Sequence, residues 1–316
     1  MRKHLAALLL VLLGPGLALA QTYPGKTVRL ISGVTPGSVT DTMARILAEK
    51  LAASLGQPVI VENRLGAGGI VGGAYVAKAE PDGHTISIAA AAFTVTTLLN
   101  PGLDPKELTP VATIATMPTV IVAAPEKGYK TLADLVAAAK ARPGQLVATT
   151  AGVGSATHMH LERFRFAAGI ELLNVHMKGA PEALGEVLAG RADFYFAPVF
   201  SARSLIRDGK LLPLAMGSPK RSELMPGIPT TVELGYSKSD YNFWVGALVP
   251  SKTPRPVVER LNREFDAAVR SPDIREQLLR LGADPLTLSL ADFEAMIQRE
   301  LIENAELIKA AGIKAN

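Results

Sequence analysis

The chain has 316 residues, of which 48% are hydrophobic and 20% are charged, and it contains no cysteine. This is the composition of a globular protein with a substantial core, and the missing thiols exclude disulfides, thiol catalysis and cysteine-based metal sites. A net charge of +4, with no run of basic residues and no ladder of aromatic residues, argues against nucleic-acid binding.

The N-terminus has the pattern of a secretory signal peptide. Arg2 and Lys3 precede an apolar run at 5–13, and an A-x-A cleavage pattern ends at Ala20. A run of about nine residues is too short for a membrane-spanning helix, which needs about 20. We therefore predict a signal peptide at 1–20, cleavage after Ala20 and export to the periplasm.

From residue 26 onward, short β-type runs alternate with helical patterns, which is typical of parallel βαβ units. In the first half we predict strands at 28–31, 59–61 and 85–89, and helices at 41–55 and 71–78. In the second half the same order returns, with strands at 146–150, 171–175 and 193–197, and helices at 159–168 and from 178–181 onward.

The C-terminal third is mostly helix, at 256–269, 274–281 and 292–311, with one strand at 243–249. A lone strand followed by helices cannot form its own sheet, so this segment is predicted to return to the first half. We predict an α/β fold of two lobes with a ligand cleft between them. Lobe 1 is expected from 21–103 plus 226–316, and lobe 2 from 104–225.

Two loops of small and hydroxylated residues lie where a predicted strand feeds a helix. The first, VTPGSVTD, spans 34–41, and the second, AGVGSATH, spans 151–158. One interpretation is a plain turn, with Thr40 or Asp41 as the helix cap. The other is an anion site, because the first N–H groups of a helix have no intrahelical partner and carry partial positive charge. Two such loops, one from each lobe, could clamp a carboxylate across the cleft.

The remaining motifs give weaker signals. The segment ENRLGAGGIVGG at 62–73 fails the dinucleotide pattern G-x-G-x-x-G because Val71 stands where glycine is required. His158 and His160 lack the spacing of a metal site, so we predict no metal. Ser155 and His158 raise a hydrolase alternative, but no G-x-S-x-G occurs in the chain. Trp244 is either a core residue or part of a cleft wall.

Nine segments resemble, in order and over nearly the whole mature chain, the extracytoplasmic solute-binding proteins of tripartite tricarboxylate transporters, the Bug family. They are YPGKTVRLI, PGSVTD, VENRLGAGG, AKAEPDGHTI, TAGVGSATH, KGAPEAL, AGRADFYF, TPRPVVERLN and SPDIREQLLRLGADP. The resemblance implies a type II periplasmic-binding-protein fold that closes on a small organic carboxylate and delivers it to membrane permease subunits. It implies no catalytic residues and no cofactor, and we expect a monomer.

By position, the resemblance also implies a set of ligand-binding residues, which contact the ligand through backbone amides, hydroxyls and ordered waters. They are Thr35, Pro36, Gly37, Ser38 and Asp41 in the first loop, Gly154, Ser155, Thr157 and His158 in the second, and Ala67, Ala90, Gly179, Ala180 and Ala197 as wall positions.

Three departures from the family pattern bear on the ligand. Ser38 stands in the usual run of glycines, Met177 stands where many members have tyrosine, and Ala197 stands where many members have an aspartate tied to ligands with an amino group. We therefore expect a ligand without an ammonium group, with Asp41 as the one remaining partner for such a group. A sensor that presents the carboxylate to a membrane-bound kinase is the alternative to delivery.

Overall fold

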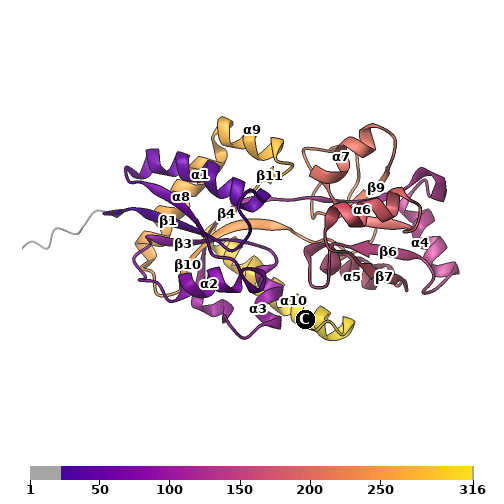
Figure 1. The fold of residues 1–316 in the computed structure, drawn as a ribbon, viewed down its shortest axis with the longest axis horizontal. Helices are drawn as coiled ribbons and strands as arrows, with labels where there is room; N and C mark the ends of the chain where they lie inside the picture. Colours follow the sequence, from indigo (N-terminus) through magenta and orange to yellow (C-terminus); the bar gives the residue numbers. More distant parts are fainter. Residues whose placement is uncertain (1–22, 315–316) are drawn as a thin grey trace, which may run out of the picture.

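The computed structural model describes residues 23–314, so the predicted signal peptide at 1–20 lies outside the described residues. Two lobes lie next to each other, and each is built on one β-sheet with helices on its faces (Figure 1). Within 23–314, no helix combines the length and the apolar character that crossing a bilayer requires.

Lobe 1 contains a six-stranded sheet with the order β11-β4-β10-β3-β1-β2. Its strands are β1 (Val28–Ser32), β2 (Val59–Asn63), β3 (Thr85–Ala90), β4 (Leu108–Thr116), β10 (Trp244–Pro250) and β11 (Asp284–Pro285). Its helices are α1 (Val39–Leu55), α2 (Ile70–Ala77), α3 (Phe93–Leu99), α8 (Arg255–Arg270), α9 (Pro272–Arg280) and α10 (Leu290–Ala311), with short 3-10 turns at Ala67–Gly69 and Pro105–Glu107. β1 runs parallel to β2 and β3, whereas β10 is antiparallel to β3 and β4.

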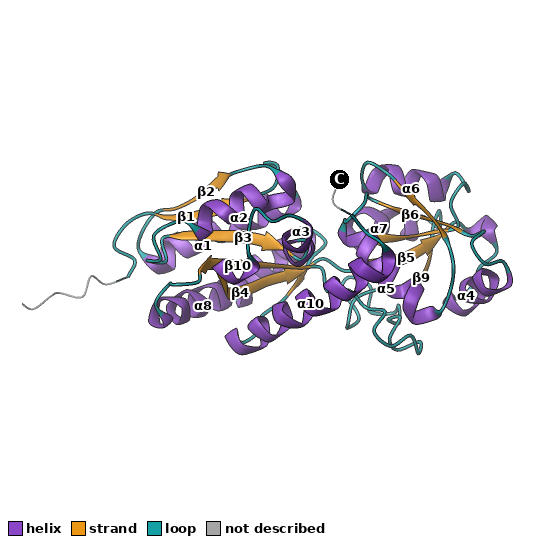
Figure 2. Ribbon diagram, turned by 90° about the horizontal axis from the view of Figure 1, so that it is seen from below, coloured by secondary structure: helices purple, strands orange, loops and turns teal. Residues whose placement is uncertain are grey.

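Lobe 2 contains a five-stranded sheet with the order β7-β6-β8-β5-β9. Its strands are β5 (Thr119–Ala123), β6 (Val147–Thr150), β7 (Leu173–His176), β8 (Phe194–Pro198) and β9 (Leu212–Met216). Its helices are α4 (Leu132–Ala141), α5 (Ala156–Ala168), α6 (Ala180–Leu188) and α7 (Val199–Arg207), with a 3-10 turn at Pro125–Lys127. Figure 2, which views the molecule from below, shows α10 extending from lobe 1 toward α5 of lobe 2.

The predicted return of the 243–249 strand to the first half is confirmed, because β10 pairs with β3 and β4. The predicted start of lobe 2 at residue 104 is wrong: β4 pairs with β10 in the first sheet, and the second sheet begins with β5. Only residues 117 and 118 separate β4 from β5. No helix or long loop marks the crossing, so the apolar pattern alone does not show where the chain changes lobes.

Trp244 is a core residue and not part of a cleft wall. Its side chain is fully buried, its ring meets that of Phe293 edge-to-face at 5.3 Å, and its Nε1 donates to Glu300 at 2.9 Å. The same apolar cluster includes Ala156 and Met159 of α5. The start of a lobe 2 helix therefore packs into a core that belongs mainly to lobe 1, which places α5 at the junction of the lobes.

Candidate functional site

Two loops share one local design at the ends of β1 and β6. We name them loop A (33–38, before α1) and loop B (151–155, before α5). Gly37 and Gly154 adopt the left-handed backbone conformation, with φ of +80° and +71°. The next residue in each loop, Ser38 or Ser155, is the N-cap of the helix, and its Oγ accepts the N–H three residues on, at 3.3 and 3.2 Å respectively.

Asp41 closes loop A from within. Its buried carboxylate accepts the N–H of Gly37 at 2.9 Å, the guanidinium of Arg45 at 2.9 and 3.2 Å, and the side-chain amide of Asn63 at 2.6 Å. Burial alone would raise the pKa of Asp41, but these hydrogen bonds outweigh it and hold the pKa below its usual value. Asp41 forms an ion pair with Arg45, one turn further along α1, and its carboxylate is therefore not available to a ligand.

His158 closes loop B in the same way. The N–H of Gly154 donates to Nδ1 of His158 at 3.0 Å, which assigns the proton of the neutral imidazole to Nε2. Burial lowers the pKa of His158 to about 4, and the nearby ring of His176 adds to the effect. At neutral pH the imidazole is an uncharged acceptor that fixes the loop. It occupies the place that Asp41 has in loop A.

Ser155 and His158 do not form the pair that the hydrolase alternative requires. Ser155 Oγ accepts the backbone N–H of His158 and lies 3.1 Å from the hydroxyl of Thr157, while the imidazole of His158 is bonded to Gly154. No serine–imidazole hydrogen bond exists here, so nothing activates the hydroxyl as a nucleophile.

The first turns of α1 and α5 contain backbone amides that are not used by the helix caps. Among the described residues, the N–H groups of Thr40 in α1 and of Ala156 and Thr157 in α5 have no hydrogen-bond partner. Each lies at the positive end of a helix of 17 or 13 residues. The arrangement can therefore hold an anion by main-chain donors, with Thr157 Oγ1 already held by the N–H of Ala151 at 2.9 Å.

A small cavity of about 70 Å³ lies behind loop A at the carboxyl ends of β1 and β3. No charged side chain lines it. The lining is Gly33, Val34, Thr40, Gly68, Gly69, Ile70, Gly73, Ser87, Ile88, Ala89, Ala90, Ala92, Phe93, Thr96 and Leu103. The predicted wall residue Ala90 is among them. The exposed Ala67 lies beside Gly68 at the start of the following turn. Thr40, a candidate helix cap within the predicted first ligand loop, lines this cavity.

The other predicted residues fall into two groups. Thr35, Pro36 and Gly37 are exposed on loop A, whereas Gly179 and Ala180 are partly buried at the start of α6. Ala197 does not lie on a cleft wall: it is fully buried on β8, in the apolar cluster between β5 and α6. Side chains alternate between the two faces of a strand. The position of Ala197 near the end of β8 therefore did not by itself predict which face its side chain occupies.

No sequence pattern pointed to Tyr195, which lies on β8 near the first turn of α5. Its hydroxyl is buried and has no hydrogen-bond partner within the described part of the chain. Burial raises the pKa of this hydroxyl, and the nearby Thr157 side chain partly offsets the shift. The proximity of Tyr195 to Thr157 joins residues that are 38 positions apart, so only the pairing of β6 with β8 brings them together.

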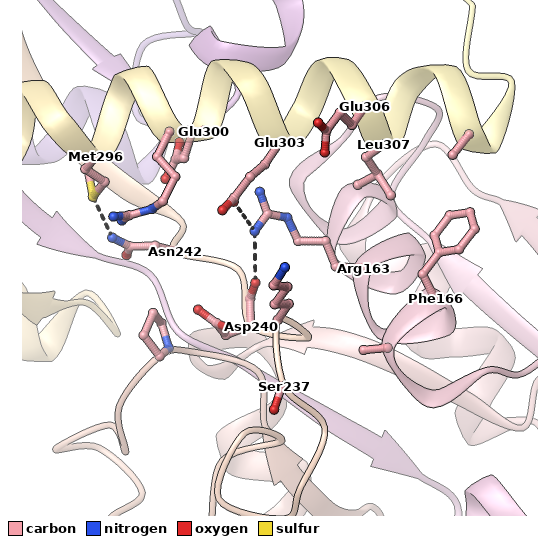
Figure 3. Close-up of a pocket in the computed structure, with 15 residues that line it drawn as sticks. Arg163, Phe166, Ser237, Asp240, Asn242, Met296, Glu300, Glu303, Glu306 and Leu307 are labelled. Carbon is pink, nitrogen blue, oxygen red and sulfur yellow. Dashed lines mark hydrogen bonds and ion pairs between the residues drawn. The ribbon is translucent and has the colours of Figure 1, made fainter.

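A second and larger cavity lies away from both loops. This back groove, of about 660 Å³, is bounded by α5, α10 and the segment 237–242 (Figure 3). None of the residues that line it belongs to loop A or loop B.

Comparison with known proteins gives a consistent result. The family model described as the tripartite tricarboxylate transporter family receptor matches residues 43–313. Protein BugT of Bordetella pertussis is 34% identical over 302 residues, which cover 93% of this chain and 92% of BugT.

Solved structures agree. A TctC solute-binding protein from Polaromonas without ligand superposes with a TM-score of 0.84 at 25% identity, over 92% of this chain and 100% of that chain. The R. palustris protein Rpa4515 with adipate gives 0.74 at 29% identity, over 92% and 99% of the two chains.

The Polaromonas structure is that of a solute-binding protein, and this chain shares its two-lobed α/β fold. The family match makes this chain a receptor and not an enzyme. The match over residues 43–313 includes loop B and most of both lobes, and it leaves out β1, loop A and the first residues of α1. The chain therefore belongs to the tripartite tricarboxylate transporter receptor family.

Proposed function

We propose that this protein captures a small organic carboxylate in the periplasm, between loops A and B, and delivers it as a monomer to the permease subunits of a tripartite tricarboxylate transporter. The observation that carries the proposal is the repeated loop: a left-handed glycine, a serine N-cap and, within the described residues, unpaired first-turn amides in each lobe. Main-chain donors of this kind suit an anion, and the adipate held by a related structure is a carboxylate.

The expected ligand carries no ammonium group. Asp41 is bonded to Arg45, Asn63 and Gly37, and Ala197 is buried in the core of lobe 2. Neither offers a free carboxylate to an amino group. An ammonium next to the first-turn amides would also meet like partial charge.

A thermal-shift screen of residues 21–316 tests the proposal. The panel contains mono-, di- and tricarboxylates, aromatic acids and the amino acids aspartate and glutamate. A ligand present at a hundredfold excess over its Kd stabilises the folded state by about 2.7 kcal/mol, so the true class should raise Tm by several degrees. We expect hits among carboxylates only. Tight binding of aspartate or glutamate would refute the ammonium-free ligand, and silence across the panel would refute carboxylate capture.

Gene deletion separates delivery from sensing. If the protein delivers its ligand, deletion abolishes uptake of the radiolabelled carboxylate that scores in the thermal screen, and expression of the gene in trans restores it. Unchanged uptake combined with a lost transcriptional response to that carboxylate would instead identify a sensor.

A further inference from the structure

The back groove has walls from both lobes. α10 of lobe 1 forms one side and α5 of lobe 2 the other, and segment 237–242, which leads from lobe 2 back to β10, forms the floor (Figure 3). A groove built in this way changes shape whenever the lobes turn relative to each other.

Arg163 of α5 is the side chain that ties the two walls together. Its Nη1 lies 3.0 Å from Oε2 of Glu303, and its Nη2 donates to Oδ1 of Asn304 at 3.2 Å, both on α10. Nη1 also donates to the carbonyl oxygen of Asp240 at 3.4 Å, and the guanidinium lies 5.4 Å from the ring centroid of Tyr241. The Arg163 side chain is 14% exposed and the Glu303 side chain is 41% exposed, so solvent screens this ion pair in part.

α5 also carries loop B at its first turn, and its second turn sits against the chain crossings between the lobes. The buried ring of His160 lies on Gly217, which directly follows β9, and its Nδ1 bonds the hydroxyl of Thr119 at 2.8 Å. Because a helix of 13 residues is a rigid unit, loop B cannot move relative to lobe 1 unless Arg163 moves too.

α10, in contrast, is part of lobe 1. Phe293 packs on Trp244, and Glu300 accepts hydrogen bonds from Trp244 at 2.9 Å and from Thr94 at 3.3 Å. The ion pair between Arg163 and Glu303 therefore spans two bodies that must turn when the cleft closes.

The lobe arrangement of this structure can be compared with two relatives by overall superposition. The chain superposes better on the Polaromonas protein without ligand than on the adipate complex, with TM-scores of 0.84 and 0.74, although it is less identical in sequence to the first. In keeping with this, Thr35 to Gly37 of loop A are exposed and Val153 of loop B is 40% exposed.

We propose that Arg163 is a latch between the lobes, which holds them in the present arrangement through Glu303 and Asn304 and so lowers the affinity for the ligand. The proposal rests on the proposed capture of a carboxylate by closure of the lobes. A protein whose binding-competent state is only fractionally populated binds more weakly by that fraction. Removal of the latch raises the fraction, and with it the affinity, without any change at loops A and B.

The test measures lobe separation and affinity in the same variants. Since the chain has no cysteine, Glu49→Cys on α1 and Lys140→Cys on α4 give two unique sites for spin labels on exposed helices of different lobes. Distances between the labels are measured with and without adipate, the probe, and the Kd for adipate is measured by calorimetry. The variants are Arg163→Ala, Arg163→Lys and Glu303→Gln.

Arg165→Ala is the matched control. Arg165 lies two residues along the same helix, but its ion pair with Glu162, at 2.7 Å, stays within lobe 2. We expect Arg163→Ala to shift the ligand-free distances toward the adipate-bound ones and to tighten adipate binding about three- to tenfold. Glu303→Gln should act in the same direction, Arg163→Lys should retain part of the latch, and Arg165→Ala should leave distances and Kd unchanged.

Unchanged ligand-free distances in Arg163→Ala would overturn the latch, as would equal weakening of adipate binding by Arg163→Ala and Arg165→Ala. If adipate does not bind, a changed distance in Arg163→Ala and Glu303→Gln but not in Arg165→Ala still supports the latch, and an unchanged distance in Arg163→Ala still overturns it. The proposed function fails separately, when no carboxylate of the screening panel binds the unmutated chain.

Discussion

The side chains of Asp41 and His158 stabilise the conformations of loops A and B through hydrogen bonds within each loop region. One acceptor in each loop, Asp41 or His158, fixes the N–H of a glycine four residues earlier, at 2.9 and 3.0 Å. Two chemically different residues thus perform one structural role. The groups left for an anion are first-turn amides, so substitutions that change the backbone should matter more than those that change charge.

Gly37→Val should abolish carboxylate binding while the protein still folds. A side chain at Gly37 meets no atom within 4 Å, but its φ of +80° strains any branched residue by about 1–2 kcal/mol. Gly56 is the control, because it has φ of +66°, equally open surroundings and a position at the far end of α1. Both valine variants should lose similar stability in urea, and only Gly37→Val should lose binding in calorimetry. Full affinity in Gly37→Val would show that loop A is only a turn.

Ser155→Ala should weaken carboxylate binding by about 1 kcal/mol or more, roughly a fivefold rise in Kd, because the cap that orients loop B is lost. Ser289→Ala provides the comparison: Ser289 caps α10 by accepting the N–H of Asp292 at 3.1 Å, remote from both loops. Each substitution should lower the free energy of unfolding by about 1 kcal/mol. Wild-type affinity in Ser155→Ala would remove Ser155 from the site.

At the scale of the elements, α5 connects three parts of the molecule. It begins at loop B, packs on the chain crossings through His160 and reaches α10 through Arg163. The tightest of these contacts is at Gly217, where an added Cβ would lie 1.8 Å from Cε1 of His160.

Gly217→Ala should therefore lower the free energy of unfolding by about 1–3 kcal/mol, since His160 is fully buried and the crossing has no room to yield. Gly227→Ala, in the same connection but with nothing within 4 Å of the added Cβ, should be close to neutral. Urea unfolding of the two variants checks this, and equal stability would show that the crossing is loosely packed.

Much of the element order could be predicted from sequence because its signals are local. The stop of α1 at Gly56, with φ of +66°, and the glycine-serine starts of α1 and α5 depend on neighbouring residues only. The crossing at 117–118, the burial of Ala197 and the approach of Tyr195 to Thr157 depend on strand pairing. The hydrogen bond between Asn63 and Asp41, which are 22 residues apart, also depends on strand pairing. Such contacts follow from topology, which hydrophobic periodicity does not specify.

At the scale of the whole molecule, the two lobes share a core that contains a buried acid. Burial raises the pKa of Glu300 to about 7 from the ordinary 4.5, although Trp244 and Arg163 oppose the shift. A carboxyl whose pKa is raised on folding stabilises the folded state below its unfolded pKa, and this stability is lost as the pH rises through the folded pKa. The junction of the lobes should therefore weaken between about pH 4.5 and 7.

Glu300→Gln removes this titration. The stability of the variant relative to the unmutated protein should rise between pH 4.5 and pH 8, by roughly 3 kcal/mol at most. Urea unfolding at several pH values measures the difference, and Glu306→Gln, on the exposed surface of the same helix, should show a flat difference. A flat difference for Glu300→Gln as well would mean that the acid titrates normally in the folded protein.

The uncharged lining of the cavity behind loop A has an evolutionary consequence. The donors proposed to bind the anion are backbone N–H groups and not charged side chains. Most single substitutions therefore leave these donors in place. Ala90, Ala92 and Thr96 line the cavity with small side chains that can be exchanged one at a time. After gene duplication, substitutions at these lining positions are expected to change which ligand one copy binds, while the main-chain donors proposed for the carboxylate are retained.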